Sequence, residues 1–319
     1  MLDSHPDLAI PHETRFLVYA YRRRARWGDL AVRENRERLA RSVVERERSR
    51  SWRLSEDLEE LVERMVAAPP TIGSVLSAGF RLYAERHGKT RWGDKRPSLL
   101  LDLDAVFAMF PDAQYINVVR DPRAVVASIR RVGEAHGWNP ERIARGAELW
   151  ERSERVARRW RRRLSADQFL EVQYERLVSE PRRTLEQVCD FLDLDPEGID
   201  RMLGFHERTA PVYSEKMHPL IVKPVTTEAV RSWQRELSPA EVAFIEHVLA
   251  GPMRRYGYEP FGSNVAPRNL RRRFRARRRR MRIKALRRRR WHLVVRHRYR
   301  HPVRDLEKSA PEVVPDGSR

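Results

Sequence analysis

The sequence predicts an α/β fold in which helices flank a parallel sheet. Two short runs rich in aromatic and β-branched residues, YINVV at 115–119 and FLEVQY at 169–174, are typical of buried strands. Long stretches with the apolar spacing of helices surround and separate these two runs. Strands that are connected by long helical crossovers favour a parallel sheet covered by helices.

Helical elements follow from the spacing of apolar residues and from signals at their starts. A helix is expected directly after Pro122, and Pro181 stands in the first turn of another, which is a favoured place for proline. The segment SPAE at 238–241 has the serine and glutamate spacing of a capping box. Apolar periodicity predicts helices over 58–67, 72–87, 98–110, 141–164, 179–192 and 238–256.

Composition excludes several classes of protein. The 319 residues contain one cysteine, which rules out a disulfide framework and any multi-cysteine metal site. Cys189 stands among apolar helix residues, so we expect a buried structural thiol there. No run of about 18 apolar residues and no signal peptide is present, and the cytoplasm is therefore the expected compartment.

The net charge of +20 is concentrated in one part of the chain. Residues 261–319 hold 21 Lys and Arg against 4 Asp and Glu, whereas the first 260 residues hold 44 against 41. Nucleic-acid binding by the body of the protein should therefore not be inferred from net charge. We expect one domain over 1–261 and an Arg-rich tail over 262–319 that is disordered or partly helical.

The junction between the strand at 115–119 and the next helix is a candidate anion site. Arg120, Asp121 and Pro122 follow the strand at once, and Ser128 lies about two turns into the helix. Ligands of open α/β sheets bind at the carboxyl ends of strands, and a helix N-terminus with an arginine suits a phosphate. The alternative is that Arg120 pairs with an acidic neighbour and that Asp121 is only the helix N-cap.

This junction resembles the 3′-phosphate-binding motif of sulfotransferases that use 3′-phosphoadenosine 5′-phosphosulfate (PAPS). In that family an arginine ends the strand and a serine follows eight positions later, as Arg120 and Ser128 do. Further segments are similar to the family's motifs and stand in its order, most closely to the branch with protein-tyrosine sulfotransferases. They are LDSHPDLAIPHETRFL at 2–17, WGDKRP at 92–97, FLEVQYERLVSEPRRTLEQVCDFLDL at 169–194, and the stretch from VYSEK to YGYEP at 212–260.

The resemblance implies a P-loop-NTPase-like fold and a sulfuryl transfer from PAPS to a hydroxyl or amine acceptor without a metal. It implies that Glu13 is the general base and that Lys95 stabilises charge on the transferring group. It also implies that the adenosine 3′,5′-bisphosphate moiety is bound by five residues: Arg120, Ser128, Tyr174, Ser214 and Lys223.

Each of these residues also has a plain structural interpretation. Glu13 and Lys95 are equally the solvated charges that any surface carries, and Tyr174 is equally a core aromatic at the end of its strand. Ser214 and Lys223 are equally ordinary loop residues. The segment HGKT at 87–90 has the end of a phosphate loop but lacks its first glycine, since position 83 is a tyrosine.

The family's Gly-containing loop for the 5′-phosphosulfate has no counterpart in the sequence, whose first glycine is Gly28. Two alternatives follow: the true start lies upstream of Met1, which we favour, or the protein is a truncated relative. In either case we expect the 319-residue chain to have little transferase activity.

Two functions of other classes stay open beside the sulfotransferase. One is a non-catalytic nucleotide- or anion-binding protein, and the weaker one is a kinase of the P-loop type. The tail is either a solvated polycation or a segment that binds an anionic membrane surface or nucleic acid. Binding of the tail to a membrane surface would make the protein peripheral to the membrane.

Overall fold

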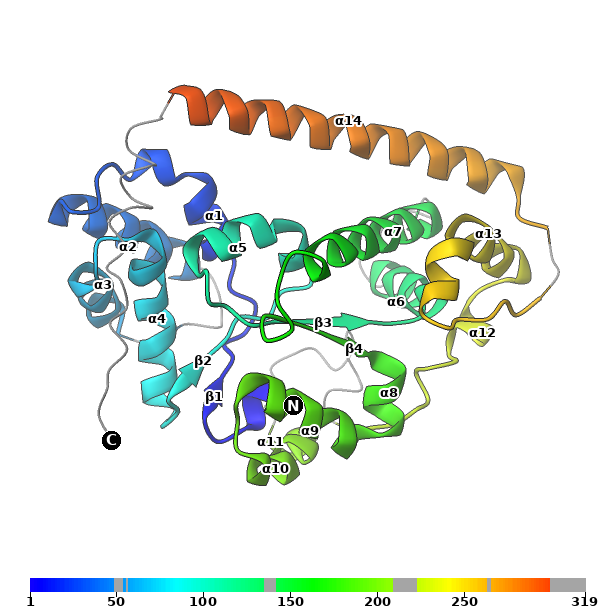
Figure 1. The fold of residues 1–319 in the computed structure, drawn as a ribbon, viewed down its shortest axis with the longest axis horizontal. Helices are drawn as coiled ribbons and strands as arrows, with labels where there is room; N and C mark the ends of the chain where they lie inside the picture. Colours follow the sequence, from blue (N-terminus) through cyan, green and yellow to red (C-terminus); the bar gives the residue numbers. More distant parts are fainter. Residues whose placement is uncertain (49–53, 56, 135–141, 209–222, 263–264, 299–319) are drawn as a thin grey trace. The chain divides into compact units, whose positions relative to one another are not determined.

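The computed structural model describes residues 1–48, 54, 55, 57–134, 142–208, 223–262 and 265–298 (Figure 1). The chain divides into two units. Residues 2–113 with 290–319 form one, which we call the N-terminal unit, and residues 114–289 with Met1 form the other, which we call the C-terminal unit. No helix in the described ranges is both long enough and apolar enough to cross a membrane.

The N-terminal unit is a set of helices around a short parallel strand pair. Leu8 pairs with Arg91, and Ala9 pairs with Trp92. The helices bury Phe16 and Phe80 completely, and the ring of Phe80 stacks on Trp92 at 4.6 Å between centroids. Its elements are β1 (Leu8–Ala9), α1 (Phe16–Arg22), α2 (Arg33–Arg48), α3 (Leu58–Ala67), α4 (Ile72–Arg86), β2 (Arg91–Trp92) and α5 (Leu103–Met109).

Local chemistry explains where these helices begin and how closely they pack. The side chain of Asp57 accepts from two amides in the first turn of α3, and Thr71 caps α4 by accepting from the amide of Ser74. A Cβ on Gly73 would lie 2.3 Å from the carbonyl oxygen of Met109, so only glycine allows α4 to approach α5 so closely.

The C-terminal unit contains the two strands that the sequence predicts. Strands β3 and β4 pair in parallel, with Tyr115 opposite Phe169 and Val119 opposite Gln173. The strands are β3 (Tyr115–Val119) and β4 (Phe169–Gln173). The helices are α6 (Pro122–Glu134), α7 (Arg142–Arg161), α8 (Tyr174–Ser179), α9 (Pro181–Leu192), α10 (Ile199–Leu203), α11 (Phe205–Arg208), α12 (Trp233–Glu236), α13 (Pro239–Arg255) and the start of α14 (Arg268–Arg298).

The core of the C-terminal unit lies between α6, α7, α13 and the first turns of α14. Phe244, Ile245 and Leu249 of α13 are fully buried in it. Ser238 and Glu241 form the predicted capping box at the start of α13, with Pro239 in the first helical turn. The predicted class, α/β with parallel strands and many helices, is thereby confirmed.

Several predicted helices differ from the observed ones by one to three residues at an end, and two predictions differ in the type of element. The helix expected over 98–110 is a 3₁₀ turn at Leu99–Asp102 followed by α5, because the backbone of Asp102 leaves the helical region with φ −125°. The strand expected over 169–174 ends at Gln173, and Tyr174 is already the first residue of α8.

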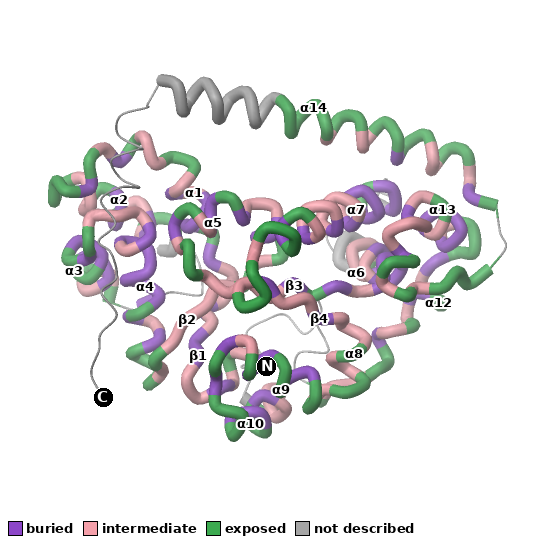
Figure 2. The backbone as a smooth tube through the Cα atoms, viewed as in Figure 1, coloured by how far each residue is buried: buried purple, intermediate pink, exposed green. Residues whose placement is uncertain are grey.

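Helix α14 makes up most of the described part of the predicted Arg-rich tail. Figure 2 shows that residues 268–286 of this helix are largely exposed, with a buried position in its first turns. Residues 299–319 of the tail lie outside the described residues.

Candidate functional site

The carboxyl end of β3 presents Arg120 as the sequence predicts. Its guanidinium lies 4.4 Å above the ring of Tyr174 and donates to the carbonyl oxygen of Ala229. The carbonyl of Arg120 itself accepts from the indole N–H of Trp150 at 2.9 Å, which holds the strand end in place. The register of β3 and β4 explains why the two side chains stack. Val119 and Gln173 are the last paired residues, and Arg120 and Tyr174 directly follow them.

No carboxylate among the described residues pairs with Arg120, so the alternative of a neighbouring ion pair is not what the structure shows. Its Nε–H is buried and lacks a hydrogen-bond partner within the described ranges. A guanidinium with unused donors beside the start of α6 is suited to an anion with several oxygens.

Asp121 is the N-cap of α6, a role that the sequence suggested for it as an alternative. Its carboxylate accepts from the amide of Arg123 at 2.8 Å and forms an ion pair with the Arg123 side chain at 2.7 Å. Arg123 is buried, lies 4.2 Å from the ring centroid of Trp233, and pairs with Glu246 of α13 at 2.6 Å. This ion-paired group fixes the first turn of α6 to α13.

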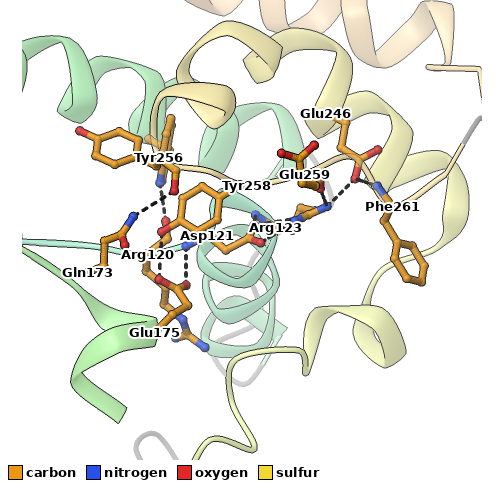
Figure 3. A network of polar contacts seen from close by, with 11 residues as sticks. Arg120, Asp121, Arg123, Gln173, Glu175, Glu246, Tyr256, Tyr258, Glu259 and Phe261 are labelled. Carbon is orange, nitrogen blue, oxygen red and sulfur yellow. Dashed lines mark hydrogen bonds and ion pairs between the residues drawn. The ribbon is translucent and has the colours of Figure 1, made fainter. Parts of the chain in front are cut away.

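A second contact holds the same turn to the start of α8 (Figure 3). The carboxylate of Glu175 accepts from the amide of Asp121 and from the hydroxyl of Tyr258, both at 2.9 Å. Burial, aided by the charge of Glu175, raises the pKa of Tyr258 well above its ordinary value, so the phenol remains a donor. Arg120 and Tyr174 therefore extend from a rigid base.

The remaining residues predicted to bind the nucleotide are Ser128, Lys223 and Ser214. Ser128 is half-buried on α6, two turns beyond Asp121. Lys223 is exposed and stands on the segment that leads to Ala229, the acceptor of the Arg120 hydrogen bond. Ser214 lies outside the described residues.

In the N-terminal unit the structure brings Glu13 and Lys95 together. Their side chains form an ion pair at 3.1 Å, although 82 residues separate them in the chain. The lysine side chain is 60% exposed and the glutamate side chain 25% exposed, so both can reach a ligand from solvent.

Asp94, beside Lys95, was assigned no role by the sequence. Its carboxylate accepts from the hydroxyl of Thr14 at 3.0 Å, and Thr14 is buried beside Glu13. Burial raises the pKa of Asp94 to about 6, against the opposing effects of the Thr14 hydrogen bonds and of Arg96. This hydrogen bond joins the two segments that carry Glu13 and Lys95.

Comparison with known proteins decides the family. The model of a family described as the sulfotransferase family matches residues 1–197. The chain belongs to the sulfotransferase family.

Curated relatives of this sulfotransferase family member agree. The chain is 25% identical over 270 residues to a protein-tyrosine sulfotransferase of Drosophila melanogaster and 25% identical over 267 residues to protein-tyrosine sulfotransferase A of Caenorhabditis elegans. Each alignment covers 82% of this chain but only 49% and 63% of those two proteins, so the chain spans about half to two thirds of their length.

Solved structures with the same fold agree with this family. The sulfotransferase domain from the Synechococcus PCC 7002 olefin synthase matches with a TM-score of 0.52 and 24% identity, covering 81% of this chain and 88% of the domain. The sulfotransferase domain from the curacin biosynthetic pathway matches with a TM-score of 0.50 and 19% identity, covering 78% and 90%. The sulfotransferase fold that the sequence predicts is confirmed.

A cavity of about 310 Å³ in the C-terminal unit does not coincide with the predicted residues. It lies beside β4, and neither Arg120 nor Tyr174 lines it. Its lining residues are Arg161, Glu171, Val172, Gln173, Arg176, Thr184, Gln187, Arg255 and Tyr256.

Most of the residues that fix the end of β3 beside Arg120 were not predicted from the sequence. These residues are Asp121, Arg123 and Glu175, and only Asp121 was assigned a role there, as a candidate helix N-cap. The available signal for Glu175 is its place directly after Tyr174 in the motif QYERL.

Proposed function

We propose that the protein transfers a sulfuryl group from PAPS to a hydroxyl or amine acceptor. In this reaction the acceptor oxygen or nitrogen attacks the sulfur in line, and the bond between sulfur and the bridging phosphate oxygen breaks. The acceptor gives up a proton, and adenosine 3′,5′-bisphosphate leaves. Family membership and the similarity to protein-tyrosine sulfotransferases support this assignment.

Arg120 carries the proposal for the donor. A half-buried guanidinium that is stacked on Tyr174, without a carboxylate partner in the described part of the chain, retains donors for the 3′-phosphate. Ser128, eight residues further on, supplies a hydroxyl to the same phosphate in this proposal. Lys223 closes over the nucleotide in the same proposal, and Ser214, for which the resemblance implies the same role, lies outside the described residues.

The ion pair of Glu13 and Lys95 carries the proposal for the chemistry. Glu13 accepts the proton of the acceptor, which removes its negative charge and frees Lys95 from the pair. The lysine ammonium then stabilises the negative charge that develops on the bridging oxygen. Lys95 must be mobile for this step, and its 60% exposed side chain permits that.

Binding of adenosine 3′,5′-bisphosphate, measured by titration calorimetry, tests the donor site. We expect Arg120→Ala to weaken this binding about 100-fold, the effect of losing about two charge-assisted hydrogen bonds. Adenosine 5′-monophosphate, which lacks the 3′-phosphate, should bind both proteins alike. The control is Arg131→Ala, which removes an exposed arginine from helix α6, the helix that follows Arg120. Equal binding of the bisphosphate by wild type and Arg120→Ala would contradict the proposal.

Transfer of labelled sulfate from PAPS to a panel of phenols, alcohols and amines tests the reaction itself. We expect any turnover to fall by about 100-fold or more in Glu13→Gln, with the affinity for the bisphosphate unchanged. Nucleotide binding with no transfer to any acceptor would favour the non-catalytic alternative.

A further inference from the structure

Helix α14 has two faces of different character. Phe274 is buried and meets Phe244 edge-on at 6.0 Å between ring centroids. On the same side, Arg277 pairs with Glu148 of α7 at 3.5 Å and Arg278 pairs with Glu151 at 3.0 Å. The first turns of α14 are therefore anchored to the core of the C-terminal unit.

The opposite face of α14 is exposed and strongly positive. An α-helix advances 100° per residue, so positions 272, 279, 283 and 286 lie on the side away from Phe274. Residues 268–298 contain no Asp or Glu. The exposed cations between 268 and 286, beyond Arg268 itself, are Arg272, Arg273, Arg275, Arg279, Arg280, Arg282 and Lys284.

Two large apolar side chains stand among these cations. Ile283 is 43% exposed and Leu286 is 60% exposed. They are three residues apart and share the outward side with Arg279, while Arg280, Arg282 and Lys284 flank them. A helix with exposed apolar residues flanked by Arg and Lys is the pattern that lies in the interface of an anionic bilayer.

We propose that the outward face of α14, from Arg272 to Leu286, docks the protein on an anionic phospholipid surface. The arginines bind lipid phosphates and carboxylates, and Ile283 and Leu286 enter the boundary between headgroups and acyl chains. Because Phe274 and the two ion pairs hold the helix start, the face is ordered before it meets the membrane, which lowers the entropic cost of binding. The exposed apolar pair favours lipid over nucleic acid, whose phosphates offer it no apolar environment.

Co-sedimentation of the full 319-residue chain with vesicles tests this proposal. Vesicles of phosphatidylcholine with about 30 mol% phosphatidylserine should bind it, and pure phosphatidylcholine should not. Each arginine near such a surface strengthens binding about fivefold, so Arg279→Gln, Arg280→Gln and Arg282→Gln together should weaken it about 100-fold. Glutamine has a helix propensity close to that of arginine, and circular dichroism verifies that the helix content is kept.

A matched variant removes the same charge elsewhere in the C-terminal unit. The exposed residues Arg159, Arg162 and Arg201, changed to Gln together, should weaken vesicle binding less than about threefold, because binding depends on the face and not on net charge. Equal losses in the two triple variants would overturn the proposal.

The double variant Ile283→Ser with Leu286→Ser separates lipid from nucleic acid. We expect it to lose about tenfold in vesicle binding and to keep whatever affinity the wild type has for a labelled DNA duplex. If the double variant binds vesicles as the wild type does, or if DNA competes the protein off vesicles at equal phosphate concentration, the lipid assignment is wrong.

Discussion

Replacing Asp94 by asparagine tests the electrostatics beside the Glu13–Lys95 pair. Burial raises the pKa of Asp94 from 3.8 to about 6. The folded chain therefore holds this proton more tightly than the unfolded chain does. The protonated Asp94 carboxyl stabilises the folded chain in full below about pH 4. This stabilisation is lost as the pH rises to about 6, because ionising the buried carboxyl costs free energy.

The shift of about two pKa units corresponds to about 3 kcal/mol, of which partial solvent screening leaves about 2 kcal/mol. Asparagine keeps an oxygen that can accept from Thr14 but cannot ionise. We expect the unfolding free energy of Asp94→Asn to exceed that of the wild type by about 2 kcal/mol near pH 7.5 and to equal it near pH 4.

Urea unfolding of both proteins at a series of pH values between about 4 and 8 measures the difference. The control is Asp112→Asn, which removes an exposed carboxylate of the same unit. If Asp94→Asn is no more stable than the wild type near pH 7.5, or if its advantage is the same at every pH, the assigned burial of the Asp94 charge is refuted.

Three further changes test the C-terminal unit by thermal or urea unfolding. Arg123→Met leaves the buried carboxylate of Asp121 and the half-buried carboxylate of Glu246 without their counter-charge and should cost about 3 kcal/mol of unfolding free energy. Phe274→Ala should cost about 3 kcal/mol and expose the start of α14 to trypsin, seen as faster cleavage there in limited proteolysis. Tyr258→Phe removes the hydroxyl that donates to Glu175 and should cost about 1 kcal/mol, whereas Tyr115→Phe, whose hydroxyl has no partner within the described ranges, should change stability by less than about 0.5 kcal/mol.

Local signals allowed a good part of the fold to be predicted. The strand at 115–119 was predicted with its observed bounds because five strand-forming residues are followed by a proline-started helix. The capping box at Ser238 was likewise visible, because its two residues are three positions apart. Tyr174 was assigned to the wrong element, since its side chain fits a strand as well as the first turn of a helix.

Contacts between distant parts of the chain could not be predicted in the same way. The salt bridge of Glu13 to Lys95 joins segments 82 residues apart, and only family resemblance suggested that the two share a site. The raised pKa of Asp94 depends on burial that no local pattern encodes. The hydrogen bond from the Asp121 amide to Glu175 depends on the pairing of β3 with β4, which the sequence predicts only as a class of sheet.

The pairing of Val119 with Gln173 has a consequence for how this protein can change over evolution. Arg120 and Tyr174 meet because each is the first residue after its strand, whatever the length of chain that connects the strands. The strand register, and not the number of residues between Val119 and Phe169, brings the two side chains together. A single deletion within 169–173 would shift the residues on one side of the deletion by one position and turn their side chains to the opposite face of the sheet. The strand itself should therefore tolerate no change in length, and insertions are expected between α6 and α7 and not within these two helices, whose buried faces form the core.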